Sequence, residues 1–372
     1  MNRWNYGTGS ILAAASSIRR YYGLKTYSPT SPLLDRWLNE YSFRCVIVIL
    51  ADAMGSFILP KHLSSESFLR RHVCMDMETV FPTATTAATT ALRTGQPPSR
   101  TGWIGWSQYF SEKNDLVIPF LSKGMYSSRQ YEPHLAEKLL KTEYTVDQLN
   151  QAGIHAENVW PSFGETNPCR DYHEVAETTL RLSEKKDIRF IYAYWDLLDT
   201  LMHRNGTDHV LVKEELETIN QYTESLAERM PGDCGLIVMA DHGQVDTDTI
   251  DLRKYPELLD CLIHAPMLEA RMTAFAVKEE KKEAFETRFL KCFGKEFALV
   301  KSDEMLRQGW FGDACGPAFR KEFIGDYVSY ALAAWRFGMN DAQLNTKGDH
   351  GSILKQERTV PLILYPDPVH GI

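Results

Sequence analysis

Four short apolar runs divide the chain, at residues 45–50, 189–195, 235–240 and 360–365. Each is rich in β-branched or aromatic side chains and has no polar alternation, which predicts a strand buried on both faces of a sheet. Segments with helical spacing separate the runs, at 133–141, 172–184 and 212–230. Strands that alternate with helices predict an α/β fold with a doubly wound, mostly parallel central sheet, right-handed crossovers and helices on both faces.

Two further segments refine the organisation of the chain. Residues 1–40 predict an N-terminal helical extension, in which apolar side chains at helical spacing pack against the rest of the protein. Residues 265–325 carry a strand, a charged amphipathic helix, a second strand and a capped helix start. We interpret this stretch as a small α+β cap insertion within one large domain that spans 41–372.

Composition and charge exclude several classes of protein. With 44% hydrophobic and 24% charged residues, the 372-residue chain is typical of a soluble globular protein. Its 41 basic and 49 acidic residues give a net charge of −8, which does not favour a nucleic acid polymer as partner. Seven scattered cysteines without CxxC spacing do not predict a disulfide framework or a zinc finger.

The N-terminal residues give no targeting or membrane signal. The apolar stretch at 11–15 is too short to span a bilayer, and the segment lacks the order of regions found in a signal peptide. We therefore expect a cytoplasmic location and no membrane association.

Polar residues with metal-ligating side chains follow the predicted strands. Asp199 and His203 have i, i+4 spacing, which places them on one face of a helix. The same kinds of side chain stand after the first and third runs and before the last one, at Asp52, Asp241, His242 and His350. Taken alone, each is more often a helix cap or a turn residue. Their recurrence at the carboxyl ends of strands, where α/β sheets bind ligands, predicts a site for two divalent metals with mixed nitrogen and oxygen ligands, most naturally zinc.

The segment 81–95, FPTATTAATTALRTG, is the one compositionally biased stretch. Pro82 disfavours helix before it and the alanines favour helix after it, so we expect a loop that becomes a helix near Thr85. A hydroxyl at a helix N-terminus suits an anion such as phosphate. Capping and packing are the ordinary explanation for such threonines, and only the neighbouring polar residues favour a functional role.

Five segments, taken in order and at their separations, resemble the alkaline phosphatase superfamily, and within it the nucleotide pyrophosphatase/phosphodiesterase branch. They are ADAMG at 51–55, FPTATTAATTALRTG at 81–95, DTLMHRNG at 199–206, ADHG at 240–243 and GDHGS at 348–352. The resemblance extends from about residue 44 to the C-terminus and excludes most of 245–340. It implies that 41–372 forms an alkaline-phosphatase-like catalytic domain.

The resemblance also implies a role for each site residue. Thr85 is the expected nucleophile, bound to one metal ion together with three side chains, Asp52, Asp241 and His242. The second metal ion is expected on Asp199, His203 and His350. Asp196 and Asp349 match no ligand of the family and are interpreted as structural or supporting residues. Two tryptophans remain open between an aromatic slot beside the nucleophile and simple packing, Trp103 and Trp106.

The activity implied is hydrolysis of phosphodiester or pyrophosphate bonds, with a covalent phosphothreonine intermediate on Thr85. The expected cofactors are two Zn²⁺ ions, with Mn²⁺ as the alternative, and the expected substrate is small, phosphorylated and nucleotide-like. A phosphomonoesterase, phosphonate hydrolase or phosphomutase on the same core, and a non-catalytic metal-binding homologue, remain alternatives. The sequence does not predict the physiological substrate or the oligomeric state.

Overall fold

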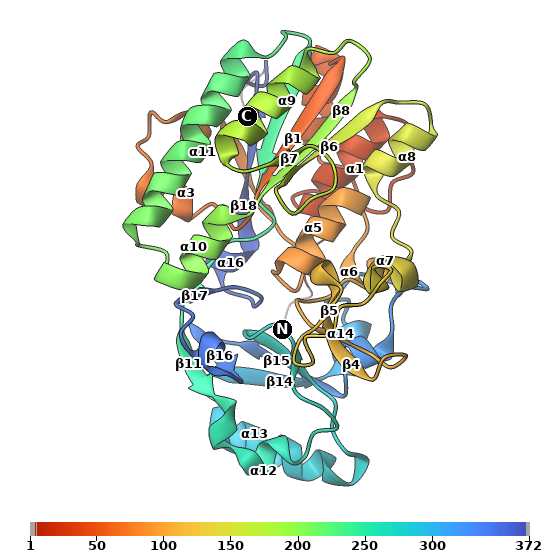
Figure 1. The fold of residues 1–372 in the computed structure, drawn as a ribbon, viewed down its shortest axis with the longest axis vertical. Coiled ribbons are helices and arrows are strands. Elements are labelled where there is room, and N and C mark those ends of the chain that lie inside the picture. The colour runs from red at the N-terminus through yellow and green to blue at the C-terminus, as the bar shows by residue number, and fades with distance from the viewer. Residues whose placement is uncertain (1–3, 5, 370–372) are drawn as a thin grey trace.

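The chain forms a large body around a seven-stranded sheet and a small body around a four-stranded sheet (Figure 1). The computed structural model describes residue 4 and residues 6–369. The large sheet has the strand order β2-β18-β9-β1-β8-β6-β7. Its strands are β1 (Cys45–Ala51), β2 (Val73–Glu78), β6 (Ala156–Pro161), β7 (Pro168–Cys169), β8 (Phe190–Trp195), β9 (Cys234–Met239) and β18 (Thr359–Tyr365).

The pairing of these strands confirms the predicted fold class. Strand β1 lies at the centre and is parallel to both β8 and β9. Among the described strands of this sheet, β18 alone runs against its neighbours, because it is antiparallel to β9 and β2. Every residue of β1 and β9 is buried, as the continuous apolar runs predicted.

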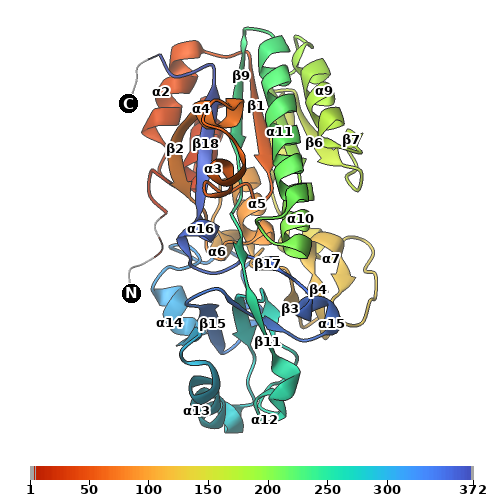
Figure 2. The same ribbon diagram turned by 90° about the vertical axis from the view of Figure 1, so that its left-hand side faces the viewer.

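Helices cover both faces of the large sheet, and Figure 2 shows one of these layers in front. This layer consists of α3 (Ile58–His62), α4 (Phe68–Arg71), α9 (Tyr172–Ser183), α10 (Leu197–Asn205) and α11 (Val210–Arg229). The opposite layer consists of α1 (Ile11–Tyr21), α2 (Pro32–Tyr41), α5 (Thr85–Thr94) and α8 (Thr145–Gln151). None of the helices in the described residues is long and apolar enough to cross a membrane.

The N-terminal helices belong to the main core. Helix α1 packs against α5, and side chains from α1 and α2, including Ile11, Leu34 and Trp37, join the hydrophobic cluster around the sheet. Residues 1–3 and 5, which are part of the predicted extension, lie outside the described residues. A domain boundary near residue 40 stays a prediction.

The small body is built on a sheet with the strand order β12-β13-β15-β14. The strands are β12 (Met267–Leu268), β13 (Met272–Phe275), β14 (Phe297–Lys301) and β15 (Tyr327–Ala331). Strand β15 pairs with both β13 and β14, although it follows the range 265–325 that was predicted as a cap. Two further pairs of strands lie between the two bodies. Strand β10 (Val245–Asp246) pairs with β17 (Gly348–Asp349), and β11 (Asp248–Asp251) pairs with β16 (Trp335–Gly338).

The remaining elements are short. Three strands form a separate antiparallel sheet, β3 (Gln108–Phe110), β4 (Asp115–Ile118) and β5 (Lys123–Gly124). The other helices are α6 (Pro98–Thr101), α7 (Leu135–Leu140), α12 (Pro256–Leu259), α13 (Lys282–Phe293), α14 (Ser302–Arg307), α15 (Asp341–Leu344) and α16 (Lys355–Arg358), with 3₁₀ turns η1 (Pro119–Leu121), η2 (Leu252–Lys254), η3 (Glu279–Lys281) and η4 (Lys321–Phe323).

A buried ion pair joins the two bodies. Arg271, at the start of β13, donates two hydrogen bonds of 2.8 Å to the carboxylate of Glu357 in α16, and neither side chain is exposed. The same carboxylate accepts hydrogen bonds from the backbone N–H groups of Ser352 and Leu354, each 3.0 Å long. These four hydrogen bonds hold the carboxylate in place, and the pair fixes the chain that follows His350.

We expect Glu357→Gln to destabilise the protein by about 3–5 kcal/mol, because it leaves the buried Arg271 guanidinium without its counter-ion. Guanidinium unfolding followed by circular dichroism measures the change. The matched control is Glu217→Gln, which removes an exposed helical ion pair with Lys213 and is expected to change stability by at most about 0.5 kcal/mol. Equal midpoints for the two variants would contradict the prediction.

Candidate active site

Helix α5 presents one threonine to the space between the two bodies. It begins at Thr85, as predicted, after an extended Ala84, and it ends at Gly95, whose φ of 70° is the left-handed conformation that favours glycine. Thr86, Thr89 and Thr90 are buried, whereas Thr85 is half-buried and lines a cavity of about 440 Å³. The first turn of α5 leaves backbone N–H groups directed at the same space.

The register of the central sheet places two aspartates together. Leu50 of β1 pairs with Met239 of β9, so Asp52 and Asp241 each stand two residues beyond a paired position. The N–H of Ala53 then donates to the Asp241 carboxylate at 3.1 Å. Because the strands are parallel and in register, both carboxylates leave the same edge of the sheet.

His242 completes the first group of potential ligands. Its Nε2 lies 3.4 Å from Asp52 Oδ1 and 3.5 Å from Asp241 Oδ2, and Thr85 Oγ1 lies 3.0 Å from the same nitrogen. Ligand atoms of Asp52, Asp241 and His242 lie within 4.8 Å of one another, close enough to hold one metal ion. Asp52 Oδ1 is buried and has no hydrogen-bond partner among the described residues, which leaves it free to act as a ligand.

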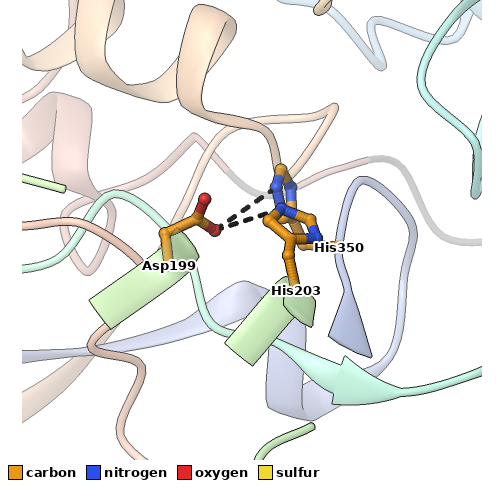
Figure 3. A group of neighbouring side chains, drawn as sticks. All are labelled: Asp199, His203 and His350. Atoms are coloured by element: carbon orange, nitrogen blue, oxygen red, sulfur yellow. Dashed lines mark ion pairs between the residues drawn. The ribbon is translucent and has the colours of Figure 1, made fainter. Parts of the chain in front are cut away.

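The second group comes from α10 and from the turn after β17 (Figure 3). Asp199 and His203 project from one face of α10, and His203 Nε2 lies 3.4 Å from Asp199 Oδ1. His350 lies beside His203 and approaches the same oxygen, with its Nε2 at 3.7 Å. The rings of His242 and His350 stack with centroids 3.8 Å apart, so the two groups are adjacent.

Backbone carbonyl groups fix the orientation of all three imidazoles. Nδ1 of His203 lies 2.8 Å from Gly348 O, and Nδ1 of His350 lies 3.0 Å from Thr83 O. Nδ1 of His242 lies 3.2 Å from the carbonyl oxygen of Gly243. A carbonyl oxygen only accepts, so each Nδ1 carries the proton and each Nε2 presents a lone pair, as metal-bound histidines do.

Burial makes the site electrostatically unusual. It raises the pKa of Asp199 to about 6, and it raises the pKa of Asp52 well above its ordinary value, with the Asp241 carboxylate as the next cause. Burial also lowers the pKa of His242 to about 3. The His242 imidazole is thus neutral, and burial together with neighbouring carboxylates opposes the ionisation of Asp52 and Asp199.

Several supporting residues were not predicted from the sequence. Tyr194 donates a short hydrogen bond to the second oxygen of Asp52, and Thr89 donates to Asp241 Oδ2 at 3.1 Å. Gln244 donates to Asp199 Oδ1 at 2.6 Å. Gln244 directly follows the ADHG segment, and Tyr194 precedes Asp196 by two residues, but neither residue type signals such a contact by itself.

The structure also places the four residues whose roles were left open. Asp349 accepts from Arg336 Nε at 2.5 Å and lies 3.9 Å from His203 Nδ1, so it supports the second group. Burial opposes ionisation of Asp349, but Arg336 and the two histidines outweigh it and lower its pKa to about 2. Asp196 is the residue directly before α10, and its side chain makes no capping hydrogen bond to that helix. Trp106 lines the cavity, whereas the slot prediction is wrong for Trp103, which is buried in a core cluster.

Comparison with protein families assigns the chain to a family. The family model described as type I phosphodiesterase / nucleotide pyrophosphatase matches residues 46–353, which is most of the chain. The chain belongs to this family. The activity class of this protein is therefore that of the family, hydrolysis of the phosphodiesterase and pyrophosphatase type. No curated protein matches the sequence.

Solved structures support the fold at low sequence identity. Murine ectonucleotide pyrophosphatase/phosphodiesterase 5 superposes with a TM-score of 0.64 at 17% identity, covering 86% of this chain and 87% of that chain. Its human counterpart gives the same TM-score and coverage at 16% identity. Phosphonoacetate hydrolase from Sinorhizobium meliloti gives 0.63 at 15% identity, covering 88% of this chain and 91% of that chain.

Proposed function

We propose that the protein is a two-metal hydrolase of small phosphodiesters or pyrophosphates in which Thr85 is the nucleophile. The observation that carries the proposal is the position of the Thr85 hydroxyl, 3.0 Å from His242 Nε2 and at the start of α5. The hydroxyl therefore faces the first group of ligands, and the second group is adjacent to it. A murine relative has been solved as an inactive threonine-to-alanine variant in complex with AMP, which fits a threonine nucleophile and a nucleotide-like substrate.

The residues present fit two divalent cations. Three imidazoles whose Nδ1 atoms face carbonyl oxygens, three carboxylates and the unpartnered Asp52 Oδ1 form a mixed nitrogen and oxygen donor set suited to zinc, with manganese as the alternative. Asp52, Asp241 and His242 would hold one ion beside Thr85. The other ion would be held by Asp199, His203 and His350. When bound, such ions lower the pKa of a hydroxyl and neutralise charge on a phosphoryl group.

The residues of this chain then perform two displacements. Thr85 Oγ1 forms a bond to phosphorus while the bond from phosphorus to the leaving oxygen breaks, which gives a phosphothreonine. Water attacks that phosphorus in the second step and releases the threonine. The N–H groups in the first turn of α5 face the phosphoryl oxygens and stabilise the charge that develops on them.

The proposal is tested by hydrolysis of bis(p-nitrophenyl) phosphate, p-nitrophenyl phosphate and phosphonoacetate by zinc-loaded protein. A strong preference for the diester supports it. A preference for the monoester would favour a phosphomonoesterase or phosphomutase, and cleavage of phosphonoacetate would favour the chemistry of the Sinorhizobium relative. Two equivalents of bound metal without any hydrolysis would indicate a non-catalytic homologue.

Gln244→Leu is expected to weaken metal binding about 10–100-fold, because Gln244 Nε2 holds the Asp199 carboxylate in place. Zinc titration against a competing chromophoric chelator measures the dissociation constants. The control is Gln221→Leu, at an exposed glutamine of α11. Identical zinc affinities for the two variants would show that the contact does not support the site.

A further inference from the structure

Glu269 stands in a turn of unusual conformation beside the site. It follows β12, and its N–H donates to Met272 O at 3.0 Å, which closes the turn into β13. The preceding Leu268 has a φ of 74°, a strained conformation for a residue other than glycine. Backbone hydrogen bonds in both directions with Ser107, of 2.8 and 3.3 Å, hold Leu268 there. The fold thus fixes the backbone that presents Glu269.

The carboxylate of Glu269 lines the cavity that also contains Thr85 and His350. One carboxylate oxygen accepts the N–H of Trp106 at 2.6 Å. Gly351, next to His350, lies so close that a Cβ there would come within 2.9 Å of Glu269 Cβ. Glu269 is therefore packed against the loop that carries a residue of the second group.

Among the described residues, no cation neutralises this carboxylate. Its second oxygen accepts no hydrogen bond, and it forms no ion pair. Arg336 lines the same cavity, but it bonds to Asp349 and to the carbonyl oxygen of Gln343. Burial and the nearby carboxylates of Asp349 and Asp199 raise the pKa of Glu269, so a hydrogen-bond donor or a cation on a ligand would favour the ionised form of this side chain.

Aromatic and apolar side chains form part of the cavity wall beside Glu269. Trp106 and Tyr126 are 38% and 46% exposed, and both line the cavity together with Leu268 and Met339. These side chains can pack against the organic part of a substrate, and the Glu269 carboxylate among them can accept hydrogen bonds or attract a cation.

We propose that Glu269 is a specificity-determining residue that binds the ester group of the substrate through a hydrogen-bond donor or a positive charge on that group. The inference rests on the proposed function and adds the class of substrate. The ester group is a hydroxyl-bearing sugar or an amino alcohol. The two groups of metal-ligating residues, with their ions, bind the phosphoryl part.

The test compares Glu269→Gln with the wild type on three chromogenic diesters. These are the p-nitrophenyl ester of thymidine monophosphate, which has a sugar hydroxyl, p-nitrophenyl phosphorylcholine, which has a cation, and bis(p-nitrophenyl) phosphate, which has neither. Glutamine keeps an oxygen for the Trp106 N–H, so the turn is preserved. The matched control is Glu283→Gln, an exposed glutamate of α13.

In Glu269→Gln, kcat/KM for the thymidine or the choline ester is expected to fall about tenfold or more relative to the bis ester. A loss confined to the thymidine ester assigns the sugar hydroxyl, and a loss confined to the choline ester assigns the cation. An equal effect on all three esters, or no effect, would overturn the proposal.

A binding measurement separates failure of this inference from failure of the proposed function. Calorimetric titration of zinc-loaded Thr85→Ala protein with thymidine monophosphate and with phosphorylcholine needs no turnover. Adding Glu269→Gln is expected to weaken at least one of the two about tenfold, while inorganic phosphate binds equally. Unchanged affinities for both ligands would overturn the role of Glu269 even if hydrolysis is observed.

Discussion

Thr85→Ala is expected to reduce diester hydrolysis by roughly 10³-fold or more while leaving the metal content of the protein unchanged. The substitution removes the side-chain oxygen of this protein that is proposed to bond to phosphorus. The three carboxylates and three imidazoles that form the two groups stay in place. Steady-state kinetics with bis(p-nitrophenyl) phosphate measures the loss, and elemental analysis of the same sample measures zinc.

Thr90→Ala is the matched control for that experiment. Thr90 lies in the same helix, is buried, and its hydroxyl has no partner among the described residues, so its loss removes no contact to the site. We expect activity within a few-fold of the wild type. Thr85→Ala protein that keeps more than about a tenth of the wild-type rate would contradict the nucleophile assignment.

Removal of metal is expected to abolish hydrolysis and to lower the melting temperature. Without cations, the carboxylates of Asp52, Asp199 and Asp241 lie close together, and their raised pKa values express the free-energy cost of ionising them there. A bound ion offsets that cost, and at a free concentration one thousand times its dissociation constant each ion stabilises the folded state by about 4 kcal/mol.

The experiment is dialysis against a chelator, followed by an activity assay and a thermal melt, with dialysis in plain buffer as control. Readdition of Zn²⁺ or Mn²⁺ is expected to restore both properties, and the better of the two identifies the preferred metal. Full activity in protein shown by elemental analysis to be metal-free would contradict the two-metal proposal.

The sequence predicted the inner strands β18, β9, β1 and β8 of the large sheet because fully buried strands have continuous apolar runs, but it did not predict β2, β6 and β7. The run at 45–50 became β1, and the one at 235–240 became β9, each shifted by at most one residue. Strand β15 was not predicted, because its short YVSYA segment mixes polar and apolar residues and gains its burial from β13 and β14. Burial of that kind depends on the partner strand and is invisible in a local pattern.

The residues of the candidate site were likewise predicted only in part. Asp52, Asp241 and His242 were brought together because they follow strands that share one edge of the sheet. Tyr194 and Gln244 support them through contacts across the fold, and their residue types carry no comparable signal. The metal-ligand roles themselves remain a prediction that the two experiments above address.

The alignment of Asp52 with Asp241 makes the site sensitive to changes in chain length. Each residue of a strand advances about 3.3 Å and turns the side chain to the opposite face. Deleting one residue inside β9 would therefore move Asp241 away from Asp52 and reverse its direction, even if the sheet still formed. Deletions among homologues should accordingly be absent from β1 and β9 and concentrated in connections such as residues 126–130, so alignment gaps would map how strictly the sheet sets the distance between the two carboxylates that would hold one metal ion.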